Sequence, residues 1–109
     1  MSVMSDEQIL AEITGIISSH RVVVFMKGDP DEPRCGFSAR VAERLLEADV
    51  EFMAVDVLPD PRIREQLSGF SGWPTIPQLF VDGTLIGGCD IIMELHEQGE
   101  LTKILTPAE

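Results

Sequence analysis

Hydrophobic positions in the first half of the chain follow helical and strand-like spacings in turn. Four isoleucines in segment 9–17 fall at i, i+4, i+7 and i+8, which predicts an amphipathic helix after the polar segment 5–8. Segment 22–26 is an unbroken run of β-prone apolar residues, typical of a strand that is buried on both faces of a sheet. Apolar residues at helical spacing in 41–48 predict a second helix, and 52–57 predicts another mostly buried strand.

A third helix is predicted to begin at Asp60-Pro61, where an aspartate suits the N-cap and a proline suits the first helical position. Ile63, Leu67 and Phe70 continue this helix at i, i+4 and i+7. A glycine at position 69 or 72 is expected to end it.

The last part of the chain predicts a β-hairpin followed by helices. Two apolar runs, 77–81 and 84–87, flank Asp82-Gly83, a dipeptide that favours a type I′ turn. Asp90 is expected to cap a closing helix, and 101–105 predicts one more short helical turn. The resulting order is α-β-α-β-α-β-β-α-α. Because a right-handed βαβ unit precedes an antiparallel hairpin, we expect an α/β fold with a four-stranded mixed sheet and helices on both faces.

Composition narrows the class of protein. The chain has 109 residues without repeats or linkers, which predicts a single domain over 1–109. Nineteen acidic and eight basic side chains give a net charge of −11, which disfavours nucleic acid and anionic membrane surfaces as partners. The sequence shows no secretory signal, and its two cysteines form no Cys-x-x-Cys pair. A reducing compartment such as the cytoplasm is therefore expected.

Cys35 is the leading candidate for chemistry. It begins the tetrapeptide Cys35-Gly-Phe-Ser38, where a loop with two prolines and three acids meets the second helix. The free N–H groups and positive dipole end of a helix stabilise a thiolate, and Lys27 and Arg34 can add positive charge. The alternative is an inert, buried cysteine. The adjacent proline and the loop-to-helix junction favour a reactive, partly exposed thiol.

Two further segments carry candidate binding groups. In Trp73-Pro-Thr-Ile-Pro77, Pro77 is a candidate for a cis peptide bond, which would expose the backbone of Ile76 to an extended peptide; the alternative is an ordinary loop. In Gly87-Gly-Cys-Asp90, free helical N–H groups suit a carboxylate and Asp90 suits an ammonium, although Asp90 could be a cap alone.

Four motifs together carry a family resemblance. They are Met26-Lys-Gly28, Pro33-Arg-Cys-Gly-Phe-Ser38, Trp73-Pro-Thr-Ile-Pro-Gln-Leu79 and Gly87-Gly-Cys-Asp90. In this order and at these intervals they resemble the monothiol, CGFS-type glutaredoxins, and the resemblance runs from about Ile9 to Leu105. It implies a thioredoxin-like fold that binds glutathione beside the active cysteine.

The resemblance also implies roles for individual residues. Lys27 and Arg64 would hold the glycyl carboxylate of glutathione. Ile76 would pair with its cysteinyl backbone, at a site shaped by Thr75 and cis-Pro77. Relatives often have an aromatic residue at the position of Ile76, where the main chain is expected to act.

At the other end of glutathione, the resemblance implies that Cys89 and Asp90 bind the γ-glutamyl group. Cys35 would be the ligand of an iron–sulfur cluster. For Cys89 we expect the N–H rather than the sulfur to act, with a Cys35–Cys89 disulfide under oxidation as the alternative.

The residue at position 38 distinguishes between two possible classes of function, an oxidoreductase and a cluster carrier. A dithiol oxidoreductase needs a resolving cysteine at this position, and a hydroxyl cannot attack a mixed disulfide. Deglutathionylation needs only one cysteine and stays open as the alternative function. A [2Fe–2S] cluster needs about four thiolates, which two Cys35 thiolates and two glutathiones in a bridged homodimer would supply. The sequence therefore predicts a protein that assembles or transfers such clusters. A BolA-like protein and iron–sulfur recipient proteins are partners that the resemblance implies.

Overall fold

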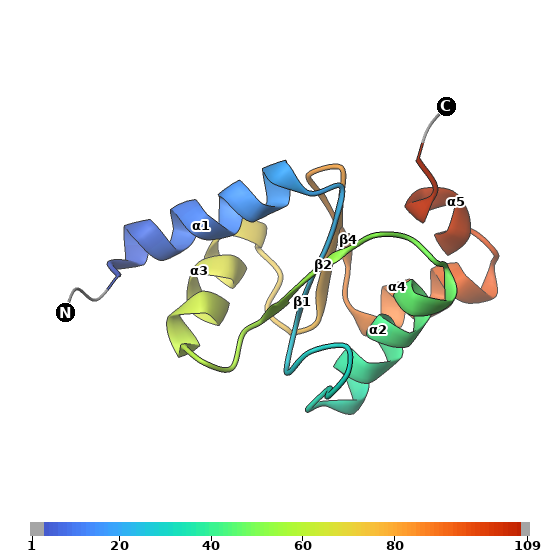
Figure 1. The fold of residues 1–109 in the computed structure, drawn as a ribbon, viewed down its shortest axis with the longest axis horizontal. Helices are drawn as coiled ribbons and strands as arrows, with labels where there is room; N and C mark the ends of the chain where they lie inside the picture. Colours follow the sequence, from blue (N-terminus) through green and yellow to red (C-terminus); the bar gives the residue numbers. More distant parts are fainter. Residues whose placement is uncertain (1–3, 108–109) are drawn as a thin grey trace.

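The computed structural model describes residues 4–107, which form four strands and five helices (Figure 1). Residues 1–3 and 108–109 lie outside the described residues, and the single domain over 1–109 stays a prediction. In chain order the elements are α1 (Asp6–Ser19), β1 (Val22–Met26), α2 (Gly36–Glu47), β2 (Met53–Asp56), α3 (Pro61–Ser71), β3 (Gln78–Val81), β4 (Thr84–Gly87), α4 (Cys89–Glu97) and α5 (Leu101–Leu105).

The strands form one mixed sheet, as the sequence predicts, and their order in it is β2-β1-β3-β4. β1 pairs in parallel with β2 and antiparallel with β3, so that Val24 lies between Ala54 and Leu79. The hairpin turn is also confirmed, because Asp82 and Gly83 both have positive φ angles, 52° and 80°. Such angles at both central residues are what a type I′ turn requires.

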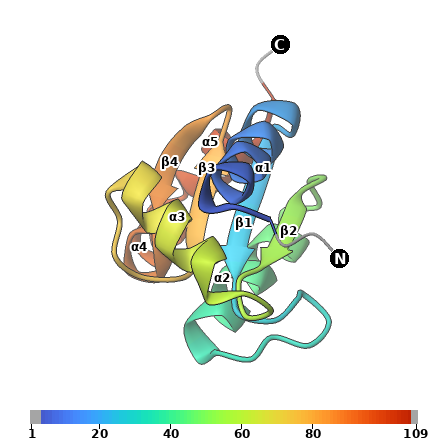
Figure 2. The ribbon, with the colours of Figure 1, turned by 90° about the vertical axis from the view of Figure 1, so that its left-hand side faces the viewer.

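Helices cover both faces of the sheet, with α1 and α3 on one side and α2, α4 and α5 on the other (Figures 1 and 2). β1 lies at the centre, and each of its five side chains is at most 1% exposed. Alternate side chains of β1 enter opposite layers: Val24 packs in the core with α2 and α4, while Phe25 packs with α1 and α3. A central strand buried on both faces explains why segment 22–26 contains no polar residue.

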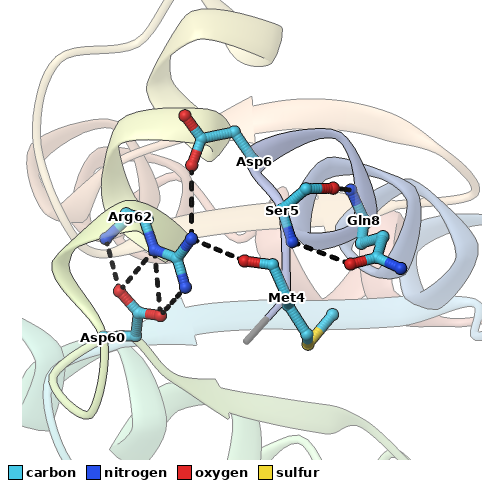
Figure 3. Close-up of polar contacts among 6 residues, drawn as sticks. All are labelled: Met4, Ser5, Asp6, Gln8, Asp60 and Arg62. Carbon is cyan, nitrogen blue, oxygen red and sulfur yellow. Dashed lines mark hydrogen bonds and ion pairs between the residues drawn. The ribbon is translucent and has the colours of Figure 1, made fainter. Parts of the chain in front are cut away.

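The start of α1 is attached to the start of α3. Ser5 and Gln8 form a reciprocal capping box at the N-terminus of α1. The Arg62 guanidinium donates hydrogen bonds to the main-chain oxygen of Met4 at 2.6 Å and to the Asp60 carboxylate at 2.9 Å, and lies 3.5 Å from Asp6 (Figure 3). One side chain thus links two helix N-termini on the same face of the sheet.

Ile63, Leu67 and Phe70 lie in α3 as expected, with Leu67 fully buried and Phe70 50% exposed. Two sequence expectations are corrected. β2 is only half-buried, since it is an edge strand with a neighbour on one side. Asp90 is not the cap of α4: Gly88 occupies that position, and Asp90 lies within the first turn. There its carboxylate still faces the positive end of the helix dipole.

Gly72 is one of the two glycines expected to end the third helix, and it does end α3, with a φ angle of 73°. Pro77 precedes β3 rather than belonging to it, consistent with its lack of an N–H for the ladder. Among residues 4–107, no helix has the length and apolar character needed to cross a membrane.

Candidate functional site

One cleft of about 410 Å³ brings together the eight residues to which the sequence analysis gives a role in binding or in chemistry. They come from five separate segments: the end of β1, the start of α2, the middle of α3, the loop before β3 and the start of α4. These eight lining residues are Lys27, Cys35, Arg64, Thr75, Ile76, Pro77, Cys89 and Asp90. Residues far apart in the sequence therefore form one surface at the end of the sheet where β1 finishes.

Cys35 is the N-cap of α2 and is partly exposed, as expected for a reactive thiol. The Cys35 side chain makes no capping hydrogen bond. Its pKa is nevertheless lowered, because the Ser38 N–H, and to a lesser extent the Phe37 N–H and the Lys27 charge, favour the thiolate over the opposing effect of burial. The helix N-terminus thus provides the thiolate stabilisation that the sequence predicts.

Arg34 does not contribute as expected. Its guanidinium is exposed and lies 3.9 Å from the carboxylate of Glu32, outside the lining of the cleft. Its main-chain N–H instead donates to the oxygen of Lys27 at 2.9 Å. Lys27 is therefore the cation that acts on Cys35, and Arg34 serves the loop geometry.

The loop before β3 is held by a buried side chain that the sequence reasoning missed. The peptide bond between Ile76 and Pro77 is cis, as expected. Gln78 is completely buried, and its Nε2 donates to the main-chain oxygens of Trp73 at 3.0 Å and Thr75 at 3.2 Å. A glutamine inside an otherwise apolar strand is the sequence signal that could have indicated this support.

The start of α4 forms the opposite side of the cleft. Cys89 is buried, and desolvation raises the pKa of its thiol although Arg40 opposes the shift. Both cysteines are free. That Cys89 contributes its N–H rather than its sulfur stays a prediction.

Four residues complete the cleft without having been selected from the sequence: Phe37, Trp73, Gly88 and Ile91. Phe37 is 55% exposed, so an apolar surface borders the thiol. A Cβ atom at Gly88 would lie 3.0 Å from Nε1 of Trp73, which explains a residue without a side chain there. Arg64, on the exposed side of α3, donates weakly to the oxygen of Pro74 at 3.4 Å.

Within residues 4–107, no three His, Cys, Asp or Glu side chains gather closely enough to hold a metal ion.

Comparison with known proteins identifies the family. The glutaredoxin family model matches residues 22–86. Glutaredoxin 4 of Pasteurella multocida is 50% identical over 96 residues, which are 88% of this chain and 88% of that protein. Probable monothiol glutaredoxin 2 of Rickettsia typhi is 47% identical over 102 residues, 94% of this chain and 92% of its own length. The chain belongs to the monothiol glutaredoxins.

Some related glutaredoxins are much longer than this chain. Monothiol glutaredoxin-S17 of Arabidopsis thaliana is 48% identical over 104 residues, but this chain spans only 21% of its length, and the same share of monothiol glutaredoxin-S11 of Oryza sativa. Among solved structures, the buckwheat glutaredoxin–glutathione complex superposes with a TM-score of 0.80 at 27% identity, covering 92% of this chain and 89% of that one. The solution structure of reduced poplar apo GrxS14 superposes with a TM-score of 0.78 at 40% identity, and the match covers 89% of each chain. The fold is thioredoxin-like.

Proposed function

We propose that this glutaredoxin binds glutathione in the cleft and, as a glutathione-bridged homodimer, assembles or transfers a [2Fe–2S] cluster. The observation that carries the proposal is the pairing of Cys35, a thiol whose pKa is lowered by the start of α2, with Ser38 at the position a resolving cysteine would occupy. Such a site can form a thiolate ligand, but it cannot complete a dithiol cycle within one chain.

The charge and the shape of the cleft suit glutathione as its ligand. Lys27 and Arg64 offer two cations to the glycyl carboxylate, and the main chain of Ile76 is available beside cis-Pro77, with Thr75 adjoining. On the other side, the N–H of Cys89 and the exposed carboxylate of Asp90 suit the charged ends of a γ-glutamyl group. The solved buckwheat glutaredoxin with glutathione supports a ligand of this class.

Cluster ligation follows from the number of thiolates. A [2Fe–2S] cluster is held by about four thiolates. Each chain supplies the Cys35 thiolate, and the glutathione bound to it supplies a second thiolate, so two chains with two glutathiones provide all four.

We propose two kinds of protein partner. One is a BolA-like protein, which would replace one chain of the homodimer, and the other is the iron–sulfur proteins that receive the cluster. Because both cysteines are free, we propose a reducing, cytoplasmic location.

A second candidate function is glutathione-dependent oxidoreduction. The lowered pKa of Cys35 favours it, because a thiolate is the nucleophile that attacks a glutathionylated disulfide. The products would be a reduced protein thiol and Cys35 bound to glutathione, from which a second glutathione releases the first as oxidised glutathione.

Anaerobic reconstitution with iron, sulfide and glutathione tests the main proposal. We expect the visible absorption of a cluster in the wild-type protein, its complete loss in Cys35→Ser, and near-complete retention in the control Cys89→Ser. Omitting glutathione should prevent assembly, and adding it back should restore it. A full cluster in Cys35→Ser, or in thiol-free buffer, would contradict the proposed ligands.

A further inference from the structure

Three successive main-chain oxygens in the loop before β3 are occupied by side chains of the same protein. The oxygens of Trp73 and Thr75 both accept from Nε2 of Gln78, at 3.0 and 3.2 Å. The oxygen of Pro74, which lies between them in the sequence, accepts from the Arg64 guanidinium at 3.4 Å. These contacts fix the course of the main chain through the first part of the loop.

Ile76, the next residue of this loop, has a different main-chain environment. In the described part of the chain, neither its N–H nor its oxygen has a hydrogen-bond partner. Its side chain packs in the core with α1 and α3, yet the residue lines the cleft. Main-chain groups that lack an internal partner must be satisfied by solvent or by a ligand. The loop therefore leaves the main chain of Ile76 open to the molecule that occupies the cleft.

The amide of Gln78 suits the task of holding two oxygens in a dry environment. Gln78 is completely buried, and one amide nitrogen has two N–H donors, one for each oxygen. Lysine and arginine also have several donors, but an unpaired charge at such a position is costly. Oε1 of Gln78 has no partner among the described residues, which is a cost that an apolar side chain would avoid. Stability alone therefore does not account for a glutamine here.

We infer that Gln78 is a positioning residue, whose amide fixes the oxygens of Trp73 and Thr75 and so holds the Ile76 main chain in the orientation that pairs with the extended backbone of a peptide ligand. This inference rests on the proposed glutathione site, in which Ile76 pairs with the cysteinyl backbone. Gln78 itself does not touch the ligand. A glutamine that only filled the core would affect stability and leave the affinity of the folded protein unchanged.

Calorimetric titration of the reduced apo-protein with S-methylglutathione, whose blocked thiol cannot react, tests this role. Gln78→Met has a similar size but no N–H donor, so we expect the dissociation constant to rise about five- to twentyfold. The matched control is Leu79→Val, at the next residue of β3, which is fully buried and outside the lining of the cleft. It should lower stability to urea and leave the dissociation constant unchanged. An unchanged constant in Gln78→Met, or an equal rise in Leu79→Val, would overturn the inference.

A second probe tests whether the effect passes through Ile76. It is an analogue of S-methylglutathione in which an ester oxygen replaces the cysteinyl N–H, so it cannot donate to the oxygen of Ile76. Because the two changes then act on the same contact, Gln78→Met should weaken binding of the analogue by only about twofold. Equal weakening of both probes would show that Gln78 does not act through Ile76.

The wild-type protein decides the matter if Gln78→Met fails to fold. In hydrogen exchange followed by NMR, the Nε2 protons of Gln78 should exchange slowly with and without S-methylglutathione. The N–H of Ile76 should become protected only when the probe is bound. Fast exchange of the Gln78 protons, or an Ile76 N–H that gains no protection from a bound probe, would overturn the inference alone. Failure of the probe to bind the wild type would contradict the proposed glutathione site, and the role of Gln78 with it.

Discussion

At the scale of single residues, two cysteines of one cleft have opposite environments. The start of α2 and Lys27 lower the pKa of Cys35, whereas burial raises that of Cys89. Because the thiolate is the species that reacts, Cys35 should become alkylated at a lower pH than an ordinary thiol and Cys89 only at a higher one. At intermediate pH, labelling should therefore be confined to Cys35.

Peptide mass spectrometry after short exposure to iodoacetamide at a series of pH values measures this difference. The control is the protein unfolded in urea, where both thiols lose their local environments and should react alike. Reaction of Cys89 at or below the pH at which Cys35 reacts would contradict the assigned environments.

The site residues show what local sequence can and cannot predict. Cys35 at a loop-to-helix junction and Pro77 before a strand are local features, and the structure confirms the partly exposed thiol and the cis peptide bond. Ser38 was not recognised as a support of the site, because its partner, the N–H of Lys27, lies in another segment. The partners of Gln78, the main-chain oxygens of Trp73 and Thr75, are near in sequence, but the hydrophobic pattern does not show that the side chain turns back to them. Such contacts depend on tertiary packing, which periodicity does not reveal.

At the scale of elements, the loop between β1 and α2 depends on a glycine. Gly28 has a φ angle of 86°, and a Cβ atom there would lie 2.4 Å from the main-chain oxygen of Glu32. Gly28→Ala should therefore destabilise the protein by about 2 kcal/mol, through backbone strain and steric overlap. Urea unfolding followed by circular dichroism measures this change.

Gly15→Ala in α1 is the matched control. Nothing lies within 4 Å of a Cβ atom at Gly15, and its backbone is helical. Alanine there should stabilise by about 0.5 to 1 kcal/mol, because glycine loses more backbone entropy in a helix. Equal effects of the two substitutions would mean that the loop does not require the left-handed conformation.

The prediction of helices, strands and turns succeeded where the local sequence pattern alone determines the structure. The apolar run 22–26 predicts the central strand, and Asp82-Gly83 predicts the turn. It failed where the surrounding structure decides. Segment 52–57 was expected to be a mostly buried strand, but β2 is half-buried at the edge of the sheet. Gly88, in extended conformation, rather than Asp90 precedes the first residue of α4. Asp90 is thereby left in the first turn, beside the cleft.

At the scale of the whole molecule, the proposed homodimer joins two chains that each carry a net charge of −11. Repulsion between two such acidic chains opposes association, and salt screens it. The attraction must then come from the shared cluster and from the apolar surface beside the thiol, where Phe37 is exposed. The dimer is accordingly expected to separate when the cluster is lost.

The most direct measurement is the mass of the anaerobically reconstituted protein under native conditions. The account predicts a species whose mass equals two chains, two glutathiones and one [2Fe–2S] cluster, and which dissociates to single chains when the cluster is removed. A cluster-containing species that lacks glutathione, or a single chain holding the whole cluster, would contradict it.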